Sequence, residues 1–453
     1  MIKPVRYLID LLRFFGVVFL LVFVGGQAVF ALEVPGGQTK QGDTPSGRTA
    51  EEAPEGQRIG GEVMGPDGGY IHPFLLVEGR YTDNLYYTDT NEEDDFITSV
   101  SPGLWVAVPS NREKLVELQT SNTSPGGLRV SRIKPEATRR MQSYFLYSPE
   151  FVTYADNSTH DHVDHTAEGM FQYNFDTGLS IDVMDKFNKN NEINNNASGR
   201  LDEYYDNLFN FLAVYEPSEK LRFRADYSNY LLDYDDSANE FRDRVDNSVS
   251  MYVFYKVKPK TSVFVEYDFA DINYDENSLF DSQEHRYYAG VDWDVTAKTR
   301  GRAKMGLIEK NFDESGIDDE EGFSMEVQAQ HNFSPKRAIN LNLFRHYTES
   351  SIGDSWASMT TGADAALLQR FTEKWSSTVS VNFTRDDYEG AYTSGGKTDE
   401  REDDTFRAGA SLIFEPRDWL SFDLGYYYSN RDSNFSEFDF ENNTVYITAE
   451  LVM

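Results

Sequence analysis

The chain has 453 residues with 42 Lys and Arg against 76 Asp and Glu, so its formal net charge is −34. It contains no cysteine, which excludes disulfide scaffolds, thiolate metal sites and cysteine nucleophiles. A charged fraction of 26% excludes a multi-helix membrane protein, 14% aromatics exclude a disordered acidic chain, and the acidity argues against a nucleic-acid partner.

The first 70 residues show no pattern of a folded domain. A basic start (Lys3, Arg6 and Arg13) precedes an apolar run from Phe14 to Val24 and small residues that end at Ala31. We interpret residues 1–31 as a secretory signal peptide. The alternative is a retained membrane anchor, for which the apolar run is short. Residues 32–70 are rich in Gly, Pro, Thr and Glu, which predicts a flexible periplasmic linker.

From residue 71 to residue 453, apolar and polar residues alternate over stretches of about ten to thirteen residues. One such stretch places four apolar residues on one face and a mixed set on the other: Val263, Val265, Tyr267 and Phe269 against Phe264, Glu266, Asp268 and Ala270. A two-residue period is typical of a β-strand with two different faces. Helical spacing is not sustained anywhere in this region.

The breaks between these stretches alternate in length and composition. Short breaks such as 335–337 carry Pro and basic residues, whereas long breaks such as 390–403 are acidic and rich in Asn or Gly. Short periplasmic turns and long extracellular loops are typical of outer-membrane barrels. We therefore predict an all-β fold, a transmembrane antiparallel up-and-down β-barrel of about 18 strands with both termini in the periplasm. A soluble sandwich or propeller is the alternative, but the charged polar face suits a wet lumen better.

The start of the predicted barrel carries a family resemblance. Tyr81 to Tyr86 (YTDNLY) ends the first strand, and Asp95 to Leu104 (DFITSVSPGL) begins the second. This region, over about residues 70–175, resembles the putative β-barrel porin 2 group of outer-membrane proteins, and beyond it only the architecture is similar. The resemblance implies a location in the outer membrane of a Gram-negative bacterium, a role in exopolysaccharide export, and periplasmic polysaccharide-export components as partners.

A basic insertion interrupts the barrel pattern at 121–140. It contains Pro125 and a Gly pair, which disfavour a regular strand, and then five basic residues, Arg129, Arg132, Lys134, Arg139 and Arg140. The strand order makes it begin on the periplasmic side. We expect it to form a constriction in the lumen or to meet a periplasmic partner or an anionic polymer. The alternative is an ordinary long turn. Exposed ion pairs are worth about 1 kcal/mol or less, which predicts a mobile gate.

Charged residues on the polar face are candidates for the lumen wall. Around the turn 296–299 we expect Asp294 opposite Arg302 and Asp292 opposite Lys304, because opposite charges stabilise cross-strand pairs. Four further residues belong to the same face, Arg222, Arg224, Glu266 and Asp268. Mixed charges on this face could orient a polar solute, and the alternative is a solvated wall without selectivity.

Metal and enzyme hypotheses find little support. His160, His162 and His165 lie close together beside acidic residues, which gives a weak metal signal; a solvated loop is the alternative. The acidic loops could hold divalent cations against lipopolysaccharide, so outer-membrane lipid and lipopolysaccharide are expected partners. No G-x-S-x-G nucleophile motif occurs. We predict a protein that is not an enzyme and has no cofactor, although an outer-membrane protease or phospholipase stays an alternative.

The predicted function is an outer-membrane β-barrel channel for exopolysaccharide export. A general diffusion porin for small polar solutes is the first alternative. A structural or adhesive surface barrel with a plugged lumen is the second.

Overall fold

The computed structural model describes residues 70–109, 120–132, 140–193, 201–276, 278–296, 298–349 and 355–452. The predicted signal peptide and all of the predicted linker except Tyr70 lie outside the described residues. The same is true of Lys134 and Arg139 in the insertion.

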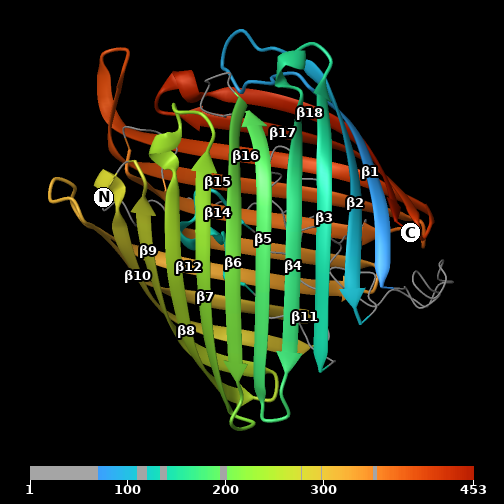
Figure 1. Cartoon of the computed structure of the whole chain (residues 1–453), viewed down its shortest axis with the longest axis vertical. Helices are drawn as coiled ribbons and strands as arrows, with labels where there is room; N and C mark the ends of the chain where they lie inside the picture. Colours follow the sequence, from blue (N-terminus) through green and yellow to red (C-terminus); the bar gives the residue numbers. More distant parts are fainter. Residues whose placement is uncertain are drawn as a thin grey trace.

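One 18-stranded antiparallel sheet forms the described structure, and it closes because β1 pairs with β18 as well as with β2 (Figure 1). The prediction of a barrel of about 18 strands is confirmed. The strands are β1 (Ile71–Thr82), β2 (Asp95–Val108), β3 (Met141–Tyr154), β4 (His162–Asn174), β5 (Leu179–Ile193), β6 (Leu201–Tyr215), β7 (Leu221–Tyr234), β8 (Arg244–Lys258), β9 (Thr261–Tyr274), β10 (Ser282–Thr296), β11 (Thr299–Phe312), β12 (Glu320–Ser334), β13 (Arg337–Glu349), β14 (Ala357–Arg370), β15 (Trp375–Ser394), β16 (Lys397–Arg417), β17 (Leu420–Ser433) and β18 (Phe440–Val452).

Short 3₁₀ turns are the only helical elements among the described residues: η1 (Pro125–Gly127), η2 (Ser158–His160), η3 (Glu240–Arg242), η4 (Ser278–Phe280) and η5 (Ser436–Phe438). None of these described helices has the length and apolar character needed to cross a membrane.

The alternation in the sequence separates an outward face from a lumen face. On β9, Val265 is 58% exposed on the outside, whereas the neighbouring Glu266 is only 4% exposed and points inward. The outward face carries many exposed Val, Leu, Phe and Tyr side chains, as expected for a surface that contacts lipid.

The two walls of the barrel cross each other. In Figure 1, strands β2–β8 run nearly along the long axis of the view, whereas β15–β18 in the opposite wall run across them. Strands of a closed barrel are tilted by about 35–45° from its axis, so opposite walls cross at a large angle.

One predicted long loop is wrong. Residues 390–403 continue the β15–β16 hairpin instead, with a tight turn at Gly395 and Gly396. Both glycines have positive φ, 58° and 83°, which is the geometry that a two-residue hairpin turn requires. Beyond a break in the ladder after Asp387, the hairpin resumes pairing from Ala391 to Glu400.

Five of the longer loops share one hydrogen bond. These loops lie at the end of the barrel opposite the short turns. An aspartate side chain accepts a hydrogen bond from the backbone N–H of the last residue of the preceding strand; for Asp243 and Tyr234 the N···O distance is 2.8 Å. The other four aspartates are Asp161, Asp281, Asp319 and Asp439. Desolvation of the Asp243 carboxyl raises its pKa to about 6.

The predicted register of the β10–β11 hairpin is wrong by two residues. Asp292, not Asp294, lies opposite Arg302, and Lys304 lies opposite Gly290. Part of the cause is an irregularity in the ladder within the last four residues of β10, which shifts every pair beyond it by one residue. The other residue of the shift comes from the turn, where Thr296 pairs directly with Thr299.

Part of the lumen is filled by an apolar cluster rather than by water. Trp105 stacks on Tyr144 with a centroid distance of 5.2 Å, and the fully buried Met184 and Leu208 belong to the same cluster. Leu128 of the insertion packs against it. The lumen is therefore polar in some sectors and apolar in this one.

Candidate functional site: a segment across the barrel lumen

The described part of the insertion, residues 120–132, lies inside the barrel. It starts with a bridge between Thr120 and Leu128, which closes a loop around the 3₁₀ turn η1. Gly126 and Gly127 in this turn have φ values of 72° and 75°. A Cβ atom on Gly127 would lie 2.2 Å from the ring of Tyr230 in the wall. Only glycine therefore allows the turn to approach the wall so closely.

The tip of this segment is bonded to strands β7 and β8. The Gly126 N–H donates to Asp246 Oδ2 at 2.9 Å, and Asp246 is held by Arg244 at 3.2 Å. Ser228 Oγ donates to the Gly126 carbonyl at 3.4 Å. Buried polar groups need such partners, so the tip is fixed in place.

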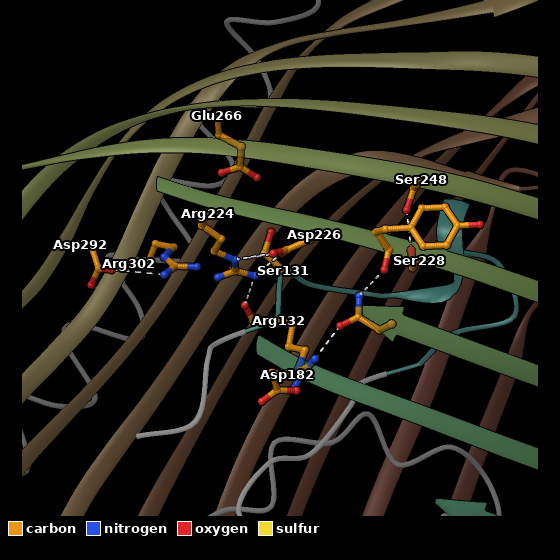
Figure 2. Close-up of polar contacts among 12 residues, drawn as sticks. Ser131, Arg132, Asp182, Arg224, Asp226, Ser228, Ser248, Glu266, Asp292 and Arg302 are labelled. Atoms are coloured by element: carbon orange, nitrogen blue, oxygen red, sulfur yellow. Dashed lines mark hydrogen bonds and ion pairs between the residues drawn. The ribbon is translucent and has the colours of Figure 1, made fainter. Parts of the chain in front are cut away.

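Arg132 attaches the segment to one side of the barrel (Figure 2). It forms a buried ion pair with Asp182 on β5 and donates to Asn210 Oδ1 on β6 at 2.6 Å. Arg224 on β7 donates to the Arg132 carbonyl at 2.6 Å and also pairs with Asp226. The Arg132 and Asp182 side chains are 1% and 0% exposed, so water does not screen their attraction.

Arg129 attaches the segment to the other side. It pairs with Asp364 on β14, and its guanidinium lies 4.9 Å from the centroid of the Phe344 ring. Between the two arginines, the Ser131 N–H and Oγ both donate to Glu326 Oε2 on β12 at 3.1 Å. Lys304 Nζ donates to Ser131 Oγ at 2.7 Å.

The two arginines together define a crossing of the lumen. Asp182 lies on β5 and Asp364 on β14, which are nine strands apart in a closed sheet of 18. These strands therefore lie on opposite sides of the barrel, and residues 129–132 extend from one to the other. We call residues 120–132 the lumen segment.

The lumen segment is held by buried ion pairs and hydrogen bonds, not by exposed ones. The prediction of weak surface pairs was therefore wrong for Arg129 and Arg132, whose side chains are 6% and 1% exposed. Removing one partner of a buried pair costs about 3–5 kcal/mol, several times the value of an exposed pair. These contacts make the lumen segment a fixed constriction in this structure.

Arg140 is the one exposed member of the predicted basic cluster that the structure describes. It bonds Tyr173 at 2.9 Å and pairs with Asp176 at 3.6 Å in a short turn. Its side chain is 66% exposed, so it lies outside the lumen.

The remaining predicted lumen residues whose side chains the structure describes face inward, and all of them except Asp268 form ion pairs. Arg222 and Arg302 share Asp292 at 3.1 and 3.2 Å. Lys304 pairs with Glu266 at 2.5 Å and with Glu326 at 3.6 Å. Asp268 faces inward without an ion pair, and the side chain of Asp294 lies outside the described residues.

The three histidines do not converge. His160 bonds the Tyr86 hydroxyl at 2.9 Å, and His165 bonds the Tyr147 hydroxyl at 3.0 Å. His162 and His165 are three residues apart on β4, so they point to opposite faces of the strand. In the part of the chain that the structure describes, no group of three or more His, Asp or Glu could hold a metal ion.

Sequence reasoning missed several charged residues of the lumen wall. Arg244–Asp246 and Glu284–Arg286 are ion pairs two positions apart on one strand face, as is Arg224–Asp226. The signal for them is opposite charge at i and i+2 within an alternating stretch. The ion pair between Lys310 on β11 and Glu349 on β13 joins two different strands, so no such spacing in the sequence indicates it.

A cavity lies between the lumen segment and the wall formed by β7–β13. Its lining includes Arg129, Ser131 and Arg132 from the segment, and Ser250, Asp268 and Tyr288 from the wall. The space enclosed by this lining is about 800 Å³ when solvent at its openings is included.

The model of the family described as putative beta-barrel porin 2 matches residues 54–452. No curated protein matches the sequence. Among solved structures, Pseudomonas aeruginosa OccK5 (OpdH) is 9% identical with a TM-score of 0.43, and the match covers 85% of this chain and 98% of that chain. Acinetobacter baumannii OccAB4 gives the same values. A bacterial polysaccharide outer membrane secretin is 7% identical with a TM-score of 0.31, covering 84% and 97%.

Proposed function

This chain belongs to the putative beta-barrel porin 2 family, and on that premise we propose that it conducts small polar solutes across the outer membrane through a lumen narrowed by residues 120–132. The chain is a porin-like outer-membrane β-barrel. What it conducts is the part that we propose.

The crossing of the lumen by the segment between Asp182 and Asp364 carries this proposal. A segment held by a fully buried ion pair at Asp182 and a partly buried one at Asp364 divides the lumen into smaller passages. Because the segment and the facing wall present charged groups and hydroxyls, the cavity between them suits a hydrated polar solute better than an apolar one.

Export of an exopolysaccharide is the second candidate. The sequence resemblance of Tyr81 to Tyr86 and Asp95 to Leu104 favours it. A polymer that passes as a continuous chain needs an open path for its whole transit. The buried pairs of the lumen segment would therefore have to separate if that path includes the cavity.

Planar bilayers with the purified barrel test the proposal. We expect stable ion conductance, together with uptake of small sugars and amino acids into liposomes that contain the barrel. A barrel that inserts but conducts no ions would contradict the channel function and favour a plugged structural barrel. Loss of surface polysaccharide in a deletion strain, with solute uptake unchanged, would favour export.

A further inference from the structure

Asp268 on β9 stands apart from the other charged groups that line the cavity. Eight charged side chains line it: Arg129, Arg132, Asp226, Asp268, Glu284, Arg286, Lys304 and Glu326. Seven of them form ion pairs at 4.0 Å or less. Asp268 forms none with a described residue, and its Oδ1 is buried without a hydrogen-bond partner.

The cation opposite Asp268 is already engaged elsewhere. Arg286 faces Asp268 across the β9–β10 ladder, but its guanidinium donates three hydrogen bonds to Glu284, at 2.8 to 3.1 Å. Ser250, which faces Asp268 on the other side in β8, also lines the cavity. The carboxylate therefore has a hydroxyl beside it and no cation bonded to it.

Among the described residues, carboxylates outnumber cations around the cavity. The described lining residues and their ion-pair partners comprise five cations and seven carboxylates, because Lys304 pairs with both Glu266 and Glu326. Arg302, which shares Asp292 with Arg222 lower in the wall, offsets one carboxylate. Asp268 forms no ion pair with a described residue, and leaving its buried Oδ1 without a bonded partner is unfavourable.

We propose that this cavity is a binding site for a small solute with an ammonium group, which Asp268 receives as its missing ion-pair partner. The inference rests on the proposed channel function and names the class of solute that the lumen retains. A metal ion is a poorer fit, since the described residues offer no group of three metal-ligating side chains. The ring of Tyr288 also lines the cavity, but Lys304 Nζ already lies 4.3 Å from its centroid. An ammonium group would therefore be bound mainly by Asp268.

Glucosamine and glucose are matched probes, because they share a ring and most hydroxyls and differ in the ammonium group. We expect glucosamine to reduce the ion current through the barrel in planar bilayers at concentrations at which glucose does not. The Asp268→Asn variant keeps the shape of the side chain and removes its charge, and its block is measured relative to its own unblocked conductance. It should raise the half-blocking concentration of glucosamine roughly ten-fold, as expected for the loss of one charge-assisted hydrogen bond.

Asp271→Asn is the control, because Asp271 lies on the same strand and its carboxylate is exposed and bonded to Asn273. It should leave the block by glucosamine unchanged. Equal block by glucose and glucosamine, or an unchanged half-blocking concentration in Asp268→Asn, would overturn the proposed site while leaving the channel intact. If the barrel conducts no ions, the proposed function fails. Calorimetry of glucosamine with the detergent-purified barrel and its Asp268→Asn variant then decides on the site separately.

Discussion

The ion pair between Arg132 and Asp182 allows a direct test of whether the lumen segment is a fixed constriction. Replacing Arg132 with Met keeps the unbranched stem of the side chain but removes the guanidinium that pairs with the carboxylate of Asp182, which is 0% exposed. Breaking a buried pair in this way costs about 3–5 kcal/mol. The ratio of docked to undocked segment should therefore fall by roughly 10²- to 10³-fold or more.

Single-channel recordings measure this effect. We expect Arg132→Met to show frequent current steps or a higher mean conductance, because the segment leaves its position more often. The double variant Arg132→Met/Asp182→Asn should return toward the parent, since removing both charges avoids the unpaired carboxylate. Arg140→Met is the matched control: it removes the same charge from the same insertion, but from a pair that is 66% and 86% exposed.

Two results would refute this reasoning. If Arg132→Met and Arg140→Met behave alike, the buried pair does not hold the segment. If the double variant is as disturbed as the single one, the important contacts of Arg132 are those to Asn210 and to the backbone, not the ion pair.

Three further predictions concern the whole barrel. Deletion of residues 121–140 should leave the barrel folded and raise its single-channel conductance; unchanged conductance would place the segment outside the conducting path. A protease site inserted between Gly395 and Gly396 should be cleaved on intact cells, whereas one at 335–337 should not, and the reverse pattern would overturn the orientation. The pKa of Asp243 is raised to about 6 by desolvation, so its folded loop binds a proton more readily than the unfolded chain does. Loop stability should therefore fall as pH rises from about 4 to 6, and amide exchange in that loop, corrected for its intrinsic pH dependence, should slow on acidification; faster exchange would contradict the sign.

The barrel could be predicted from the sequence because one physical signal repeats along the chain. Alternation decides which face meets lipid, and it does not depend on contacts between distant residues. The alternation did not predict the register correctly where the pairing between two neighbouring strands is irregular. Asp292 faces Arg302 because the turn pairs Thr296 with Thr299 and an irregularity before the turn adds one residue, and no periodicity reveals such a shift. The hairpin that turns at Gly395 was read as a loop because its charged residues resemble a loop in composition.

The insertion itself was predicted from the sequence, but the strength of its attachment to the barrel wall was not. Pro125 and the glycines indicated that the chain leaves the wall. The burial of Arg132 could not be inferred, because it depends on Asp182 and Asn210, which lie 50 and 78 residues away in the sequence. The apolar residues on both faces of β6, including Leu208 and Leu212, were an available sign that part of the lumen is filled rather than wet.

The placement of charge on the wall explains why the insertion is basic. On several strands, a lumen-facing charge forms an ion pair with an opposite charge two positions away on the same strand, as Arg244 and Asp246 do. Asp182 and Asp364 have no basic residue two positions away on their own strands. Arg132 and Arg129 of the lumen segment supply the missing cations. The segment is therefore the electrostatic complement of two opposite sides of the wall, because its two arginines place positive charge beside Asp182 on β5 and Asp364 on β14.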